Sequence, residues 1–302
     1  MDAPQPNPDR WTVARLLKWT SGHLEQRGVE SARLCAEILL SHAMQCARIE
    51  LYTRHDAVPD AGVLEAFREL LRRAADGAPV AYLTGQKEFF SLTFEVSPAV
   101  LIPRPDTEVL VERAIALARQ ESERIETILD VGTGSGCIAI SLAKHLPNVR
   151  CTAIDISQDA LSIARRNAER HGASERIEFQ CGDLFASLGE HDQFDLIVTN
   201  PPYIAAAEAN SLPRAVREYE PSAALFAGSD GFALHRRLAT EAQARLRPGG
   251  RLLTETAFDQ APRVRELFER AGWTEITIYR DDARHERVVC ARRAVAATSE
   301  VA

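Results

Sequence analysis

Four consecutive residues in the middle of the chain have the chemistry needed to hold a planar nitrogen. Asn200-Pro201-Pro202-Tyr203 follows an apolar run at 194–199 that predicts a buried strand. Asn200 supplies a side-chain carbonyl, and Pro201 supplies a backbone carbonyl without an N–H that competes with it. These acceptors can hold both N–H groups of an amide or an exocyclic amine, while the Tyr203 ring offers a flat face. The tetrapeptide therefore indicates a site for an amide-like nitrogen, although a Pro-Pro turn is the structural alternative.

The same residues suggest how such a site would work. An amide nitrogen is a poor nucleophile because its lone pair is delocalised, so it must be oriented before it can attack an electrophilic carbon. Pro201 and Pro202 fix the backbone, which preorganises the acceptors. No strong general base is evident beside the tetrapeptide. We therefore expect Asn200, Pro201 and Tyr203 to act in catalysis by positioning, and Pro202 to bind the substrate with them.

A glycine-rich loop upstream has the composition of a cofactor site. The apolar run at 127–131 includes Asp130 and is followed at once by Gly132-Thr133-Gly134-Ser135-Gly136 and a helical pattern. Glycines at these positions allow a tight turn and a close approach of the backbone to a ligand. The start of the following helix presents unpaired N–H groups. A turn that binds no ligand would need fewer glycines than this loop has.

Two cofactors are compatible with this loop. The segment 134–139 fits the dinucleotide pattern G-x-G-x-x-A, and Asp155 lies about 20 residues further on, where an acid binds ribose hydroxyls in an NAD enzyme. The spacing Asp130-x-Gly132-x-Gly134-x-Gly136 resembles motif I of the class I methyltransferases, whose loop wraps the methionine part of S-adenosylmethionine. We favour the methyltransferase, because hydride transfer has no use for paired amine acceptors at Asn200.

A further acid follows the apolar run at 177–181. Class I methyltransferases commonly have an acid here that accepts from the adenine amino group, and the next residue packs on the ring. Asp183 and Leu184 stand at these positions. Taken alone, Asp183 could equally cap a helix.

The segments that must position these residues alternate between two patterns. Short apolar runs predict strands at 127–131, 150–154, 177–181, 194–199 and 251–255. Helical spacing predicts helices at 136–145, 158–171, 232–246 and 262–271. Such alternation predicts a parallel sheet covered on both faces. Two last strands, at 274–279 and 287–291, should pair antiparallel because no helix fits between them.

The front of the chain has a different character. Helical spacing from 12 to 76 predicts a small all-helical domain at 1–76. Alternation around 92–96, with Ser91 as a turn residue, predicts a β-hairpin within a linker at 77–105. A helix opened by Asp106 or Thr107 then begins a second domain at 106–293, and the tail at 294–302 is expected to be disordered.

Composition narrows the class of protein. The 302 residues carry a net charge of -7, which does not favour duplex DNA as the main partner. The six cysteines form no CxxC pair and have no histidine at zinc-ligand spacing, so we expect no metal. The first ten residues lack the apolar segment of a secretory signal, and no run approaches the 18 apolar residues of a membrane span. These features predict a cytoplasmic protein without a membrane partner, which we expect to act as a monomer.

Several segments together resemble one family, the release-factor glutamine methyltransferases (PrmC/HemK). The resemblance extends from the N-terminal helices to about Arg292, and Pro103–Glu108 separates it from the sister family that modifies a ribosomal-protein glutamine. The segments that carry it are 79–85 with Glu88-Phe89, 100–108, 130–136 and 200–204. It implies a Rossmann-like class I methyltransferase domain. The expected α/β sheet is mostly parallel and seven-stranded with an antiparallel last strand, beside a small N-terminal helical domain.

The resemblance also implies an activity. The chain would transfer a methyl group from S-adenosylmethionine to the glutamine side-chain amide of the Gly-Gly-Gln motif in class I peptide-chain release factors. Asn200, Pro201, Pro202 and Tyr203 would hold the glutamine, and the helical domain would help to grip the release factor. The implied cofactor-binding residues are Asp130, Gly132, Thr133, Gly134, Ser135, Gly136, Asp155, Asp183, Leu184 and Asn200. The alternative is an adenine-N6 nucleic-acid methyltransferase, which shares the motif at 200–203 but usually has a basic surface and a target-recognition region.

A few positions leave questions open. Ala257 stands where the family usually has glycine, which affects loop detail, whereas Glu255 matches the family. Arg104 and Glu108 either shape the cofactor pocket or pair with each other. Arg165-Arg166 is expected to be a solvent-exposed face of its helix.

Overall fold

The computed structural model of the chain describes residues 10–120 and 125–295. Contacts between Cα atoms divide the chain into two compact units. The first contains the residues up to Gly85 together with Arg214–Tyr219, and the second contains Gln86–Pro213 and the residues from Glu220 onward. The domain boundaries expected at 76, 105 and 293 remain predictions, and most of the expected disordered tail lies outside the described residues.

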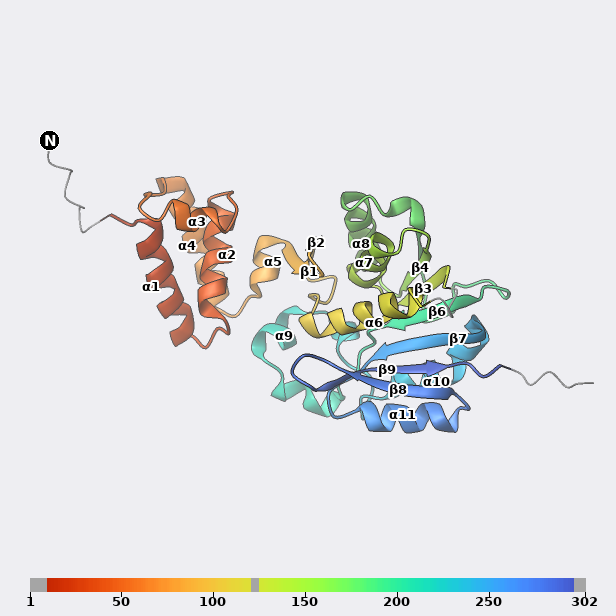
Figure 1. Cartoon of the computed structure of the whole chain (residues 1–302). Coiled ribbons are helices and arrows are strands. Elements are labelled where there is room, and N and C mark those ends of the chain that lie inside the picture. The colour runs from red at the N-terminus through yellow and green to blue at the C-terminus, as the bar shows by residue number, and fades with distance from the viewer. Residues whose placement is uncertain (1–9, 121–124, 296–302) are drawn as a thin grey trace, which may run out of the picture. The chain divides into compact units, whose positions relative to one another are not determined.

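The first unit is helical, as its apolar spacing predicts. The side chain of Thr12 caps the first helix and that of Asp60 caps the fourth, where it accepts from the N–H of Val63 at 2.9 Å. Buried leucines and Phe67 form its core. Its helices are α1 (Val13–Gln26), α2 (Ala32–Ala43), α3 (Glu50–Thr53), α4 (Ala61–Ala75), α5 (Val80–Thr84) and α9 (Arg214–Tyr219) (Figure 1). The short helix α5 was not expected, since its residues fall within the segment assigned to a linker hairpin.

The second unit opens with the predicted hairpin. Strands β1 (Gln86–Phe89) and β2 (Leu92–Glu95) pair antiparallel. The two turn residues between them, Phe90 and Ser91, have φ values of 48° and 60°. A two-residue turn with both residues left-handed matches the twist of the paired strands. Phe89 and Phe94 are buried in the core of the second unit and anchor the hairpin there.

The main sheet has seven strands in the order β5-β4-β3-β6-β7-β9-β8 (Figure 1). Its strands are β3 (Thr127–Val131), β4 (Arg150–Asp155), β5 (Ile177–Cys181), β6 (Phe194–Thr199), β7 (Leu246–Glu255), β8 (Thr274–Arg280) and β9 (Glu286–Arg292). Pairing is parallel from β5 to β7, and β9 lies antiparallel to both β7 and β8. The predicted fold class is therefore confirmed, including the antiparallel last strand.

Helices cover both faces of this sheet. The longer ones are α6 (Glu108–Ala118), α7 (Cys137–His145), α8 (Gln158–Arg170), α10 (Ala233–Arg245) and α11 (Ala261–Arg270). Successive strand residues enter two different apolar clusters, so that Ile128 packs with α6 and α7 while Leu129 packs with α10 and α11. Short 3-10 turns lie at η1 (Pro105–Thr107), η2 (Ser174–Arg176), η3 (Ala206–Ser211) and η4 (Ser222–Ala224). The carboxyl ends of β4, β3 and β6 thus lie side by side, where open parallel sheets bind ligands.

Candidate active site

The glycine loop is tied to the neighbouring strand by its backbone. The N–H groups of Gly132 and Thr133 both donate to the carbonyl of Ile154, at 2.8 and 2.9 Å. Gly132 and Gly134 have φ values of +73° and +55°, and a Cβ on either would meet nothing within 4 Å. The backbone of these two glycines therefore lies open to a ligand, and their left-handed conformation explains why glycine is needed.

Gly136 has a different reason to be glycine. Its φ is +82°, and a Cβ there would lie 2.9 Å from Cδ1 of Ile140 and 3.2 Å from Cβ of Ala164. Because Ala164 belongs to α8, this glycine lets α7 begin in close contact with that helix. Gly136 thus shapes the loop by packing and does not line the cavity described below.

Asp130 supports the loop from beneath. The residue is fully buried, and its Oδ2 accepts from the Thr133 hydroxyl at 2.6 Å and from the Ala139 N–H at 3.2 Å. Its Oδ1 has no hydrogen-bond partner within the described part of the chain. Burial is the main cause that raises the pKa of this carboxyl to about 7. Asp130 was expected among the cofactor-binding residues, but the structure places it behind the loop rather than in a cavity wall.

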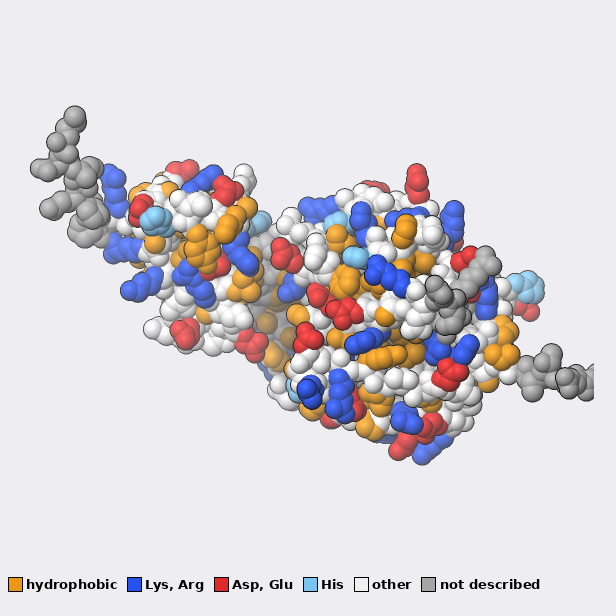
Figure 2. All heavy atoms as spheres, viewed as in Figure 1, with side chains coloured by type: hydrophobic (Ala, Val, Ile, Leu, Met, Phe, Trp, Pro, Cys, Tyr) orange, Lys and Arg blue, Asp and Glu red, His pale blue; other side chains and the backbone are white. Residues whose placement is uncertain are grey.

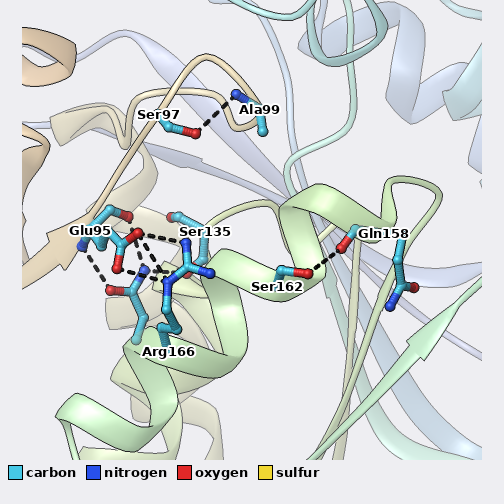
Figure 3. A network of polar contacts seen from close by, with 8 residues as sticks. Glu95, Ser97, Ala99, Ser135, Gln158, Ser162 and Arg166 are labelled. Carbon is cyan, nitrogen blue, oxygen red and sulfur yellow. Dashed lines mark hydrogen bonds and ion pairs between the residues drawn. The ribbon is translucent and has the colours of Figure 1, made fainter.

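Residues of α8 also support the glycine loop and join it to the β1–β2 hairpin. Asn167 of α8 donates to the carbonyls of Ser135 and Glu95, at 2.9 and 3.0 Å, and accepts from the N–H of Glu95 at 2.7 Å. Figure 3 shows Arg166 reaching to the carboxylate of Glu95, with an N–O distance of 2.6 Å. Arg165 lies over the Phe179 ring. Arg166 is exposed and Arg165 partly exposed, as expected of a solvated face, but both side chains also have protein partners.

Asp155 ends β4 beside the loop. Its Oδ2 accepts from the Gly134 N–H at 2.8 Å, and its Oδ1 accepts from the Ser157 N–H at 2.9 Å. Desolvation raises the pKa of this half-buried carboxyl above its ordinary value, against the effect of those N–H groups. Each carboxylate oxygen can accept more than one hydrogen bond, so Asp155 can still bind ligand hydroxyls.

One cavity of about 450 Å³ brings most of the predicted residues together. The predicted residues in its wall are Gly132, Thr133, Gly134, Ser135, Asp155, Asp183, Leu184, Asn200, Pro201 and Pro202. Apolar side chains such as Ile138, Ile156 and Phe226 line it as well. Tyr203 does not line it. The sequence therefore located one continuous site from segments far apart in the chain.

Asp183 is held by an arginine that the sequence did not indicate. Both of its carboxylate oxygens lie 2.9 Å from Nη1 of Arg237, which also lines the cavity. Leu184 is buried with a φ of 51°. The residues after Asp183 form turns, so Asp183 does not cap a helix.

The segment before α6 supplies further wall residues. Arg104 pairs with Glu220, whose buried carboxylate also accepts from the N–H of Ile102 at 3.2 Å. Glu108 accepts instead from the N–H of Phe90 at 2.9 Å. Arg104 and Glu108 therefore do not pair with each other, and only Arg104 lines the cavity. Nothing in the local sequence around Glu220 indicated its role.

The tetrapeptide at 200–203 is fixed from two sides. The Asn200 amide nitrogen donates to the hydroxyl of Thr107 at 3.0 Å. The sequence did not predict this contact. The backbone carbonyl of Tyr203 accepts from Nε2 of Gln260 at 2.9 Å, and the Tyr203 hydroxyl lies 3.4 Å from Oε1 of Glu255. Burial raises the pKa of Tyr203 well above its ordinary value, so this residue stays neutral.

Glu255 is a fully buried carboxyl at the end of β7. Burial and, to a lesser degree, Asp106 raise its pKa to about 7, while Arg287 and the hydroxyls of Thr107 and Tyr203 lower it. Its backbone carbonyl lies 3.0 Å from Nε2 of His235, a buried ring whose pKa burial lowers to about 4. His235 is therefore neutral at physiological pH.

The described part of the chain comprises residues 10–120 and 125–295. These residues contain no group of three or more His, Cys, Asp or Glu side chains that could hold a metal ion. No helix in the same ranges is long and apolar enough to cross a bilayer.

The sheet, with its antiparallel last strand, and the cavity at its carboxyl edge define a methyltransferase. The model of a methyltransferase domain family matches residues 122–284, and that of the PrmC N-terminal domain matches residues 15–85. The chain belongs to the family of release factor glutamine methyltransferases, as the resemblance in the sequence implied.

Individual relatives support this assignment. The chain is 45% identical to the release factor glutamine methyltransferase of Rhodopirellula baltica, over 97% of this chain and 100% of the relative. It is 44% identical to that of Geobacter sulfurreducens, over 94% and 98%. A solved structure, the Thermus thermophilus 16S rRNA N2 G1207 methyltransferase in complex with AdoMet and guanosine, matches with a TM-score of 0.51 and 20% identity, over 69% of this chain and 49% of that chain. The last similarity shows the fold alone.

Proposed function

We propose that this chain transfers a methyl group from S-adenosylmethionine to the side-chain amide of the glutamine in the Gly-Gly-Gln motif of class I peptide-chain release factors. The observation that carries the proposal is that Asn200, Pro201 and Pro202 line the same cavity as the glycine loop and Asp155. An acceptor site for an amide nitrogen thus adjoins a site with the features of a nucleoside pocket. The names of the relatives support the choice of substrate.

The cavity fits the proposed cofactor. Its volume of about 450 Å³ falls within the range of roughly 300–1,000 Å³ of small-molecule sites. Asp155 would accept from the ribose hydroxyls, the open backbone at Gly132 and Gly134 would face the methionine part, and Asp183 with Leu184 would meet the adenine. When bound, S-adenosylmethionine supplies an electrophilic methyl group on a positively charged sulfur.

The residues of this chain would contribute mainly orientation. The Asn200 carbonyl and the Pro201 backbone carbonyl would accept from the two N–H groups of the glutamine amide. Transfer forms the nitrogen–carbon bond and breaks the carbon–sulfur bond, and the nitrogen then releases one proton to water. Because the leaving thioether is neutral, no strong base is required. Positioning of this kind can lower a barrier by about 7–11 kcal/mol when the reacting atoms are well aligned.

The surface does not favour the nucleic-acid alternative. The chain carries a net charge of -7. On the face of the second unit seen in Figure 2, Lys and Arg side chains are interspersed with Asp and Glu rather than gathered in one basic patch. A protein whose main ligand is a phosphate backbone usually has such a patch.

Methyl transfer from labelled S-adenosylmethionine tests the proposal. We expect purified class I release factor to be labelled, and a release factor whose motif glutamine is replaced by alanine to remain unlabelled. An adenine-containing oligonucleotide serves as the competing acceptor. Equal labelling of the two release factors, or labelling of the oligonucleotide alone, would contradict the proposed substrate.

We further propose that the chain acts in the cytoplasm, because the proposed substrate works in translation, and that the first unit helps to grip the release factor. The expectation that the protein is a monomer is part of the same proposal. Size-exclusion chromatography with light scattering would check it.

A further inference from the structure

The side-chain amide of Asn200 can adopt two orientations that exchange its oxygen and its nitrogen. Its oxygen and its nitrogen are nearly the same size, but only the oxygen can accept from the substrate. If the amide were turned by 180°, it would present two donors to the donors of the substrate amide. The proposed activity therefore requires a device that sets which end of Asn200 faces the cavity.

Thr107 contacts the nitrogen end of this amide. Its hydroxyl accepts from Nδ2 of Asn200 at 3.0 Å, and its side chain lies at the cavity wall on η1 with only 2% of the residue exposed. However, a hydroxyl can donate as well as accept. Thr107 alone would tolerate either orientation of the amide, so a further group must fix the direction of its O–H bond.

The buried carboxyl of Glu255 is suited to be that group. Its Oε1 lies 3.4 Å from the Tyr203 hydroxyl, and its buried Oε2 has no hydrogen-bond partner among the described residues. The Thr107 hydroxyl is near enough to this carboxyl to lower its pKa. In its ionised form, which predominates above about pH 7, this carboxylate only accepts. With the Thr107 O–H directed at Glu255, the remaining lone pairs of Thr107 can only accept, and Asn200 must offer its N–H. The charged groups around this carboxyl are Asp106 and Arg287, which pair with each other at 2.8 Å.

We propose that Thr107 and Glu255 are positioning residues that orient the Asn200 amide, with its carbonyl directed at the substrate nitrogen. Glu255 sets the direction of the Thr107 hydroxyl, and Thr107 sets Asn200. The proposal rests on the proposed function, since it assigns the polarity of the same acceptor site. Neither residue needs to touch the transferred methyl group.

Two variants of Thr107 separate orientation from packing. Thr107→Val keeps the branched shape but removes the hydroxyl, whereas Thr107→Ser keeps the hydroxyl and removes a methyl group. We expect Thr107→Val to lower kcat about tenfold or more while the Kd for S-adenosylmethionine changes less than about threefold, and Thr107→Ser to recover most of the activity. An unchanged kcat in Thr107→Val, or an equal loss in both variants, would overturn the proposal.

Glu255→Gln tests the direction of the relay, which is the proposed chain of hydrogen bonds from Glu255 through Thr107 to Asn200. The glutamine side chain can donate an N–H to Thr107, which would turn the hydroxyl toward Asn200 and reverse the amide. We expect a loss of kcat similar to that of Thr107→Val. When Thr107→Val and Glu255→Gln are combined, kcat should fall no further than in either single variant, because both changes disrupt the same relay. Losses that multiply would show that the two residues act independently.

A spectroscopic readout does not depend on the substrate assignment. The side-chain amide of Asn200 in ¹⁵N-labelled protein, assigned with Asn200→Asp, should show slowed proton exchange. Thr107→Val should abolish this protection and Thr107→Ser should keep it; protection that is absent in the unmodified protein, or that survives in Thr107→Val, would overturn the relay. If the unmodified chain shows the protection but does not label release factor, the proposed function fails and the relay stands. Should Thr107→Val not fold, Glu255→Gln decides by the same measurement.

Discussion

The side chains at the site divide into those that follow a strand and those that come from elsewhere. Asn200 stands directly after β6 and Asp155 is the last residue of β4, so their type and position were enough to predict them. Thr107 lies 93 residues from Asn200 in sequence, and Glu220 lies 116 residues from Arg104. Contacts at such separations depend on how loops return to the sheet edge, which no local pattern encodes. The supporting role of Asp130 was missed for a related reason, since motif spacing does not distinguish a residue behind a loop from one in front of it.

The buried carboxyl of Asp130 predicts a particular pH dependence of stability. Its pKa rises from 3.8 to about 7 on folding, so folding favours the protonated form. The contribution of this group is therefore complete below about pH 4 and is lost as the pH rises through 7, by up to about 4 kcal/mol. Asp130→Asn cannot ionise and should not lose this contribution.

Thermal unfolding of both proteins between pH 5.5 and 8 measures this effect. The Tm of the wild type should fall relative to that of Asp130→Asn as the pH rises. A difference in Tm that stays constant over this range would show that Asp130 does not titrate as its burial indicates. Burial also raises the pKa of the Glu255 carboxyl. The Tm of the wild type should therefore also fall relative to that of Glu255→Gln as the pH rises.

Among the elements, the strands were predicted best because buried parallel strands read as short apolar runs. The expected strand at 251–255 is part of a longer β7 that begins at Leu246. Its pairing with β6 shifts register between the partners of Phe194 and Leu196, around Pro248-Gly249-Gly250. Proline and glycines are typical of turns, so this segment was not predicted to be part of a bulged strand. The short helix α5 was missed because it has too few residues to show a periodic pattern.

The glycines of the loop should respond differently to a methyl group. Gly136→Ala places Cβ 2.9 Å from Ile140 in a left-handed residue, which should destabilise the second unit by roughly 1–3 kcal/mol and lower Tm by several degrees. Gly132→Ala meets nothing within 4 Å, so only the backbone strain of about 1–2 kcal/mol applies.

Calorimetry distinguishes the two roles. Gly132→Ala should weaken S-adenosylmethionine binding more than its change in Tm suggests, because its methyl group lies at the cavity wall. Gly136→Ala should lower Tm strongly but weaken S-adenosylmethionine binding little. Equal effects of both variants on Tm and on affinity would remove the distinction between a ligand-facing and a packing glycine.

For the whole molecule, the change of pattern along the sequence predicted a helical domain before a second domain, and contacts between Cα atoms divide the chain into two compact units. What could not be predicted is the membership of Arg214–Tyr219, a six-residue helix that belongs to the first unit although both flanking segments belong to the second. A helix this short has no amphipathic pattern long enough to indicate what it packs against. The packing of Tyr219 against the first core reveals it, and the Arg214 side chain lies beside Gly77.

Removing the first unit should separate cofactor binding from substrate recognition. The cavity is lined by residues of the second unit alone, so a fragment from Gln86 to Val295, which keeps only α9 of the first unit, should bind S-adenosylmethionine within about threefold of the full chain. Its rate with release factor should fall about tenfold or more if the first unit grips the substrate. An undiminished rate would contradict that role, and circular dichroism controls for folding of the fragment.

The place of α9 has a consequence for synthesis on the ribosome. Most domains at the front of a chain can complete their folding before the next domain is made. Here the first unit still lacks one of its helices until Tyr219 has been translated, by which time β3 to β6 have already been translated. The first unit can therefore complete its folding only after much of the second unit has been translated. A chimera that exchanges the front of this chain with that of a relative would have to exchange 214–219 with it.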